Sequence, residues 1–185
     1  MANKLYNVLF ICKDNSARSI IAEALMNRLG KDRFRAFSAG VHPKGELHPL
    51  ALEMLGRHGL PTEGLASKSW EQVVAGAGDQ IDFIIAIRDK AAGEECPVVP
   101  GRPLTACWNV VDPAAYTGTP FERVNAFRRV FRELENRIKI MACLRLEALD
   151  RLSLRQRVDA GGAATQMEAR PQALDISFPS HSLSN

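Results

Sequence analysis

The sequence alternates short apolar runs with longer stretches in which apolar residues recur every three or four positions. The short runs are rich in β-branched and aromatic residues, which is typical of strands buried on both faces of a parallel sheet. They predict four strands, over residues 5–11, 34–38, 81–87 and 104–110. The periodic stretches predict helices over residues 17–29, 47–58, 120–143 and 145–160, with a short helix over 70–74.

Strands that alternate with helices imply right-handed crossovers and helices on both faces of the sheet. We therefore predict an α/β fold, a three-layer sandwich with a central four-stranded parallel sheet. The 185 residues are enough for one domain with a full core. We place that domain over residues 1–162. The segment 163–185 is polar, carries two prolines and lacks periodicity, so we expect a disordered tail there.

The composition excludes several classes of function. The net charge of +3 is too small to indicate a nucleic-acid partner, and the apolar runs are far too short to span a membrane. The N-terminus lacks the layout of a signal peptide, so we expect a cytoplasmic protein. Thiols stay reduced in the cytosol, so the four cysteines indicate free, catalytic or redox-active groups. No cysteine and histidine spacing suggests a metal site.

A polar loop joins the first predicted strand to the first predicted helix. Its sequence is Cys12-Lys13-Asp14-Asn15-Ser16-Ala17-Arg18-Ser19. Ligands of parallel α/β sheets bind at the carboxyl ends of the strands. A cysteine at a strand end and an arginine at a helix start predict a site that binds an oxyanion and attacks it with sulfur. The alternatives are a cysteine that only packs in the core and an ordinary surface arginine.

Two further residues follow predicted strands and are candidates for the same site. Cys96 lies in a long loop after the third strand, and Asp112 follows the fourth. Long loops without secondary structure are often functional. The alternatives are an unpaired loop thiol at Cys96 and a turn-forming Asp-Pro pair at Asp112. Cys107 and Cys143 are expected to be structural, and His42 and His48 to be solvated or capping residues.

Several segments together resemble one known family. They are Val8 to Ser19, Ser38 to Gly45, Ser67 to Trp70, Ala91 to Pro97 and Asp112 to Ala114. These segments resemble the low-molecular-weight protein tyrosine phosphatases, and most closely their arsenate reductase branch. The resemblance covers residues 5 to 160 and implies the fold predicted above.

The resemblance also implies a role for each matching residue. Cys12 would be the nucleophile, Arg18 would bind two oxygens of the anion, and Asp112 would be the general acid. Ser19 would donate its hydroxyl proton to the thiolate, and Asn15 would take a left-handed backbone conformation. The backbone of the loop would complete the oxyanion site, which gives the binding residues Lys13, Asp14, Asn15, Ser16, Ala17, Arg18 and Ser19.

The implied reaction is a thiol relay that needs no bound cofactor. Cys12 would attack arsenate, a second cysteine would attack the adduct to release arsenite, and a third would form a disulfide. Cys96 lies where the family keeps a redox pair. An external thiol reductant, either thioredoxin or glutathione with glutaredoxin, would reopen the disulfide. The partners implied are therefore an arsenate- or phosphate-type oxyanion and one of these reductants.

The sequence departs from the family pattern at two positions. Arg88 stands where the middle cysteine of the relay is expected, so the three-cysteine relay is broken and Cys96 or an external thiol would take its place. Asp14 stands where glycine is usual. A carboxylate about 5 Å from a bound anion costs roughly 1–3 kcal/mol at an effective dielectric of about 20–80, although Lys13 can offset part of this.

These departures leave three hypotheses open. The first is an arsenate reductase with an altered thiol relay. The second is a phosphatase acting on phosphate monoesters, which needs only Cys12, Arg18 and Asp112; against it, Tyr116 has no aromatic neighbour to hold a phosphotyrosine ring. The third is a degenerate member that binds an anion without turnover. The sequence makes no prediction of oligomeric state.

Overall fold

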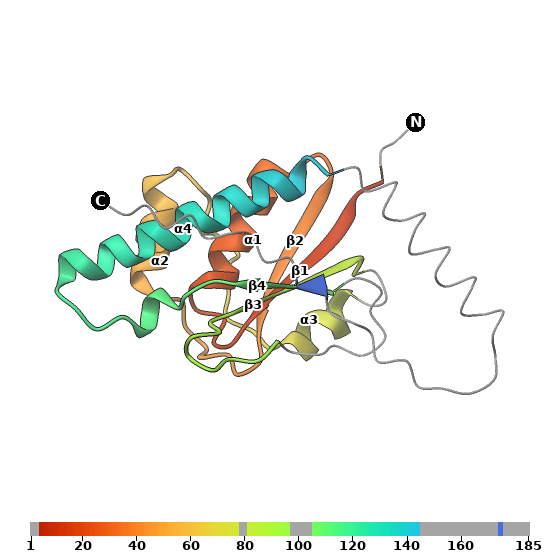
Figure 1. The fold of residues 1–185 in the computed structure, drawn as a ribbon. Helices are drawn as coiled ribbons and strands as arrows, with labels where there is room; N and C mark the ends of the chain where they lie inside the picture. Colours follow the sequence, from red (N-terminus) through yellow and green to blue (C-terminus); the bar gives the residue numbers. More distant parts are fainter. Residues whose placement is uncertain (1–3, 78–80, 97–104, 145–173, 176–185) are drawn as a thin grey trace.

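A computed structural model of the chain describes residues 4–77, 81–96, 105–144 and 174–175. These residues build a parallel sheet in the order β2-β1-β3-β4-β5 (Figure 1). The strands are β1 (Tyr6–Cys12), β2 (Phe34–Gly40), β3 (Phe83–Arg88), β4 (Thr105–Asn109) and β5 (Leu174–Asp175). The helices are α1 (Arg18–Leu29), α2 (Pro49–Arg57), α3 (Trp70–Ala77) and α4 (Pro120–Ala142), with a 3₁₀ helix at Pro113–Ala115.

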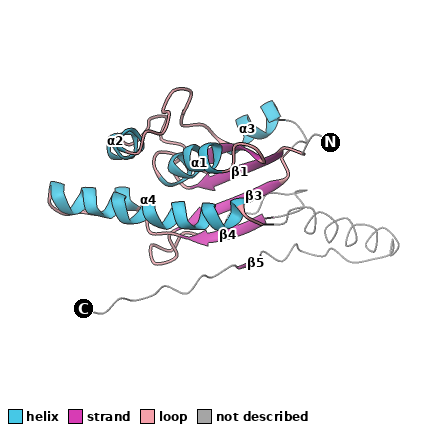
Figure 2. Cartoon of the chain, turned by 90° about the horizontal axis from the view of Figure 1, so that it is seen from above, coloured by secondary structure: helices cyan, strands magenta, loops and turns pink. Residues whose placement is uncertain are grey.

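The described elements form three layers. Side chains of α1, α2 and α4 share one apolar cluster with one face of the sheet, and α3 packs in a second cluster on the opposite face. Figure 2 shows α1 and α4 side by side over the sheet. The predicted sandwich is therefore confirmed. No helix of the described residues is long and apolar enough to cross a membrane.

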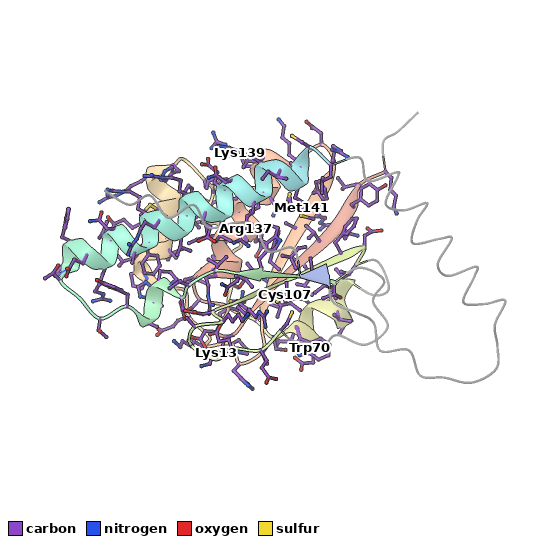
Figure 3. The ribbon with its side chains drawn as sticks, in the orientation of Figure 1. Lys13, Trp70, Cys107, Arg137, Lys139 and Met141 are labelled. Atoms are coloured by element: carbon purple, nitrogen blue, oxygen red, sulfur yellow. The ribbon has the colours of Figure 1, made fainter. Side chains whose placement is uncertain are left out.

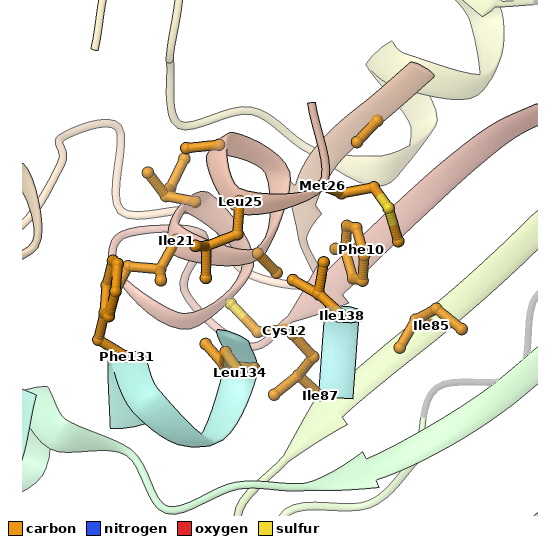
Figure 4. Close-up of a cluster of buried hydrophobic side chains, with 14 of the residues drawn as sticks. Phe10, Cys12, Ile21, Leu25, Met26, Ile85, Ile87, Phe131, Leu134 and Ile138 are labelled. Carbon is orange, nitrogen blue, oxygen red and sulfur yellow. The ribbon is translucent and has the colours of Figure 1, made fainter. Parts of the chain in front are cut away.

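Strand β1, which lies between β2 and β3, is buried on both faces, as its unbroken apolar run predicts. Val8, Phe10 and Cys12 face the cluster with α1 and α4, whereas Leu9 and Ile11 face the cluster with α3. Successive side chains of a strand point to opposite faces. Cys12 therefore ends the strand on the side where α1 begins, and Figure 4 shows its sulfur beside the apolar side chains of this cluster.

The long helix α4 is fixed at both ends. Thr119 and Glu122 form a capping box at its start, and Arg33 donates hydrogen bonds of 2.6 Å to the carbonyl oxygens of Ala142 and Leu144 at its end. One side of the helix carries the apolar residues that cover the sheet. Figure 3 shows Lys139 on the opposite side of the helix from Met141, which is 7% exposed.

The four predicted strands are all present, and the structure adds a fifth. Leu174 and Asp175 pair in parallel with Ala106 and Cys107 of β4. At these two residues the structure departs from the expected disordered tail, because a two-residue strand carries no sequence pattern. Helix α3 also extends three residues past its predicted end. The predicted helix over 145–160 and the other tail residues lie outside the described residues.

The packing of α4 can be tested with two isoleucines two positions apart. Ile138 is fully buried against the sheet, whereas Ile140 is 48% exposed. We expect Ile138→Ala to lower the free energy of unfolding by about 2–5 kcal/mol, and Ile140→Ala to change it by about 0.5 kcal/mol or less. Urea unfolding of both variants measures this. Equal losses would contradict the described orientation of the helix.

Candidate active site

The loop between β1 and α1 turns its carbonyl oxygens outward. Four of them accept hydrogen bonds of 2.8–3.0 Å from backbone N–H groups: Cys12 from Val41, Lys13 from His42, Asp14 from Lys44, and Ser16 from His48. A trans peptide points the next N–H the opposite way, so the N–H groups of the loop face inward. Within the described residues, those of the segment 13–17 donate to no protein acceptor.

Helix α1 begins at this loop without the usual caps. Its N-cap residue, Ala17, makes no side-chain hydrogen bond, and the first turn carries no acidic residue. The first N–H groups of a helix and its dipole favour a negative charge. The inward N–H groups and the uncapped helix start therefore form a cradle suited to an oxyanion.

Asn15 holds the loop in this shape. Its φ of 45° is left-handed, which confirms the expected backbone conformation. The buried amide donates to the hydroxyl oxygens of Ser19 at 2.9 Å and Ser38 at 3.0 Å, and it accepts from the backbone N–H of Lys68 at 2.7 Å. Asn15 thus makes three of the four hydrogen bonds that an asparagine amide can make, and each joins it to a different segment.

This network continues to a buried carboxyl group. Ser38 donates its hydroxyl to Glu23 at 2.5 Å, and the Lys68 ammonium lies 3.8 Å from the same oxygen. Burial raises the pKa of Glu23, although the Ser38 hydrogen bond and the Lys68 charge oppose it. Because the Ser38 hydroxyl donates its hydrogen bond to Glu23, the Ser38 oxygen acts only as an acceptor toward Asn15.

Ser19 contacts the sulfur of Cys12. Its hydroxyl oxygen lies 3.0 Å from Cys12 Sγ, and Cys12 is 3% exposed. Since Asn15 already donates to this oxygen, the Ser19 proton is available to the sulfur. The contact between Ser19 and Cys12 agrees with the expectation from the family resemblance.

Arg18 lies at the centre of the site and not on the surface. Its guanidinium donates to both carboxylate oxygens of Glu94, at 2.8 and 3.0 Å, and to the carbonyl oxygen of Val110 at 3.3 Å. Its Nη2 is also 3.3 Å from Asp112 Oδ2. Burial opposes the Arg18 charge, but the Glu94 hydrogen bond and the nearby negative charges outweigh it, so the pKa of Arg18 is raised.

Asp112 reaches Arg18 from the loop after β4. Its Oδ1 caps the 3₁₀ helix by accepting from the N–H of Ala114 at 3.1 Å. Its own N–H donates to Asp89 Oδ2 at 2.9 Å. The structure therefore brings Cys12, Arg18 and Asp112 together, as the strand-end argument predicts.

Two acidic residues of this site were missed by sequence reasoning. Asp89 is 6% exposed and joins the loop after β3 to the loop after β4. Glu94 binds Arg18 and also accepts from the N–H of Asp89 at 2.7 Å. Burial would raise the pKa of Glu94, but the hydrogen bonds from Arg18 and Asp89 lower it. One sequence signal could have identified Asp89: it directly follows the buried strand β3, at the sheet edge where Arg18 also lies.

A cavity of about 520 Å³ opens over Cys12. Its lining includes Lys13, Glu94, Glu95 and Cys96, so the structure places the two expected reactive cysteines on one cavity. Cys107 is 3% exposed in β4 and Cys143 ends α4; Figure 3 marks Cys107 on its strand. Among the described residues, no group of three or more His, Cys, Asp or Glu side chains could hold a metal ion.

The two unusual residues have different surroundings. Asp14 Oδ2 pairs with the Lys44 ammonium at 2.7 Å, and this hydrogen bond raises the pKa of Lys44. The partner of Asp14 is thus Lys44 and not the adjacent Lys13. Arg88 ends β3, and its carbonyl oxygen accepts from the N–H of Val110 at 2.8 Å. His48 caps α2, its ring accepting from the N–H of Leu50, as expected.

Fold and site together define a class of protein: an α/β sandwich with a Cys-x5-Arg oxyanion loop between its first strand and first helix. The family model described as low molecular weight phosphotyrosine protein phosphatase matches residues 7–153. The chain therefore belongs to this family, and the membership predicted from its motifs is confirmed.

The chain is similar to several arsenate reductases. It is 30% identical to that of Bacillus subtilis (strain 168) over 142 residues, which cover 77% of this chain and 97% of the relative. A crystal structure of arsenate reductase from Archaeoglobus fulgidus aligns with a TM-score of 0.61 and 30% identity, covering 73% of this chain and 98% of that one. The thioredoxin-dependent arsenate reductase of Corynebacterium glutamicum aligns with a TM-score of 0.51 and 29% identity, covering 76% of this chain and 65% of that one.

The pairing of Asp14 with Lys44 predicts a coupled effect on anion binding. We expect Lys44→Met to weaken the binding of inorganic phosphate about three- to tenfold, because it leaves the Asp14 charge uncompensated. In an Asp14→Asn background, Lys44→Met should weaken phosphate binding very little. Calorimetric titration of the two single variants and the double variant measures the coupling. An equal loss in both backgrounds would mean that Lys44 contacts the anion directly.

Proposed function

We propose that this protein reduces arsenate to arsenite with Cys12 as the nucleophile. The observation that carries the proposal is the position of Cys12 Sγ, 3.0 Å from the Ser19 hydroxyl in a loop whose N–H groups face inward. The same loop supplies Arg18 to bind two oxygens of the oxyanion. Similarity to arsenate reductases over nearly their full length supports arsenate as the substrate.

The first step joins Cys12 to the substrate. The Cys12 thiolate attacks arsenic and forms an S–As bond, and one arsenate oxygen leaves as water after it is protonated. Asp112 is the general acid in this proposal because it lies at the same guanidinium as the anion would. The N–H groups of the loop and Arg18 stabilise the negative charge on the remaining oxygens.

The second step transfers two electrons to arsenic. A thiolate attacks Cys12 Sγ, an S–S bond forms, and the S–As bond breaks with its electron pair left on arsenic, which departs as arsenite. Cys96 is the proposed attacking thiol, since it lines the same cavity as Cys12. A reductant must then reopen the disulfide. One similar arsenate reductase is thioredoxin-dependent, so we propose thioredoxin first and glutathione with glutaredoxin second.

Arsenite production by the reduced, full-length protein tests this proposal. Arsenate is supplied with thioredoxin and its reductase, and separately with glutathione and glutaredoxin. Cys12→Ser should abolish turnover, and Cys96→Ser should lower it by orders of magnitude if Cys96 forms the disulfide. The matched control is Cys143→Ser, since Cys143 is exposed at the end of α4 and should leave the rate unchanged.

The outcomes separate the open hypotheses. Turnover lost in Cys12→Ser but kept in Cys96→Ser assigns the second step to an external thiol. Hydrolysis of p-nitrophenyl phosphate without arsenite production would favour the phosphatase, which uses the same Cys12, Arg18 and Asp112. Folded protein that is silent in every assay would overturn the enzymatic proposal and leave an anion-binding member without turnover.

A further inference from the structure

The carboxylate of Glu94 binds two of the three nitrogens of the Arg18 guanidinium. Its two oxygens accept from Nη1 at 2.8 Å and from Nη2 at 3.0 Å. This is the parallel, two-bond arrangement in which arginine also binds two oxygens of a phosphate or arsenate. Arg18 is only 2% exposed in this state, and Glu94 shares the lining of the cavity over Cys12.

Glu94 is presented to Arg18 by a tight turn of the loop after β3. The N–H of Gly93 donates to the carbonyl oxygen of Lys90, and the N–H of Glu94 to that of Asp89, both at 3.1 Å. Gly93 has a φ of 74°, which favours glycine. The Glu94 carboxylate also accepts from the N–H of Asp89 at 2.7 Å. The contact with Arg18 is therefore built into the fold of this loop.

We propose that Glu94 is an intramolecular competitor that sets the affinity of the site for oxyanions, because arsenate can bind Nη1 and Nη2 of Arg18 together only after the Glu94 carboxylate has left them. This inference rests on the proposed function, since it takes the Cys12 loop as the oxyanion site. It adds a residue that the reaction itself does not need.

The charges around Arg18 make the two anions mutually exclusive. The guanidinium already has Glu94 and Asp112 within 3.3 Å, and Cys12 adds a further negative charge as a thiolate. An arsenate dianion beside both carboxylates would place excess negative charge on one cation. The dianion can displace Glu94 because it gains the inward N–H groups of the loop, which a carboxylate on Arg18 does not reach.

Displacement of Glu94 also changes the loop that carries it. The Glu94 oxygen that binds Arg18 Nη1 also accepts from the N–H of Asp89 at 2.7 Å, so a carboxylate that moves away from Arg18 also leaves this N–H. The backbone hydrogen bonds of the turn, from Gly93 to Lys90 and from Glu94 to Asp89, do not involve Arg18. Oxyanion binding and the Glu94 contact to Asp89 are then coupled, and the coupling is reciprocal.

The binding of inorganic phosphate to the reduced protein tests the competition without any chemical step. We expect Glu94→Gln to bind phosphate about ten- to a hundredfold more tightly than the wild type. The apparent affinity for phosphate rises with the fraction of molecules in which Arg18 is free of the Glu94 carboxylate, and that fraction approaches one in this variant. Glu95→Gln is the matched control. It removes the same charge from the same cavity lining, and we expect about a threefold change or less from charge alone.

Amide hydrogen exchange gives a second measurement. Phosphate should accelerate exchange at the N–H of Asp89 in the wild type, because the Glu94 oxygen that accepts from this N–H also binds Arg18. Phosphate that binds the wild type but binds Glu94→Gln equally or more weakly would overturn the inference alone, because Glu94 would then hold Arg18 in its binding geometry. Failure of wild type and both variants to bind phosphate would overturn the oxyanion site, and the proposed function with it.

Discussion

The side-chain hydrogen bonds of Asn15 are the constraint on which the site depends. A left-handed residue other than glycine costs about 1–2 kcal/mol, and Asn15 offsets this with two buried hydrogen bonds and one partly buried one, each worth about 1 kcal/mol. Gly40 makes the arrangement possible, since a Cβ there would lie 2.9 Å from the Cβ of Asn15. The inward N–H groups, the Ser19 contact to Cys12 and the position of Arg18 all follow from this shape.

A single buried cation joins the three loops at the carboxyl edge of the sheet. Arg18 is the first residue of α1, directly after the loop that follows β1, whereas Glu94 lies in the loop after β3 and Asp112 in the loop after β4. Burying such charges costs desolvation energy that their attraction often only balances. The cluster is therefore poor evidence for stability and better evidence for function. It keeps a guanidinium charged and oriented beside the loop that we propose as the oxyanion site.

The sequence predicted those parts of the molecule that rest on local pattern. Apolar runs located the four main strands, and the placement of Cys12 between a strand and a helix located the site. Asn15 and Ser19 were found only through the family resemblance, because their roles depend on contacts with other segments. Asp89 and Glu94 were missed for the same reason. They are polar loop residues without periodicity, and only the folded sheet edge brings Glu94 to Arg18 and Asp89 to the N–H of Asp112.

Arg88 changes which cysteine can take part in the proposed thiol relay. Without a cysteine at this position, the thiol nearest along the chain is Cys96, on the far side of the turn that Glu94 closes. Among the described residues this loop is also held by hydrogen bonds that do not involve Arg18: the N–H of Lys90 donates to Asn109 Oδ1 at 2.9 Å, and the Asp89 carboxylate accepts from the N–H groups of Ala91 and Ala92. Displacement of Glu94 from Arg18 would leave these contacts in place. In the proposed relay, the residues beyond these contacts would bring Cys96 to Cys12 across the cavity that both cysteines line.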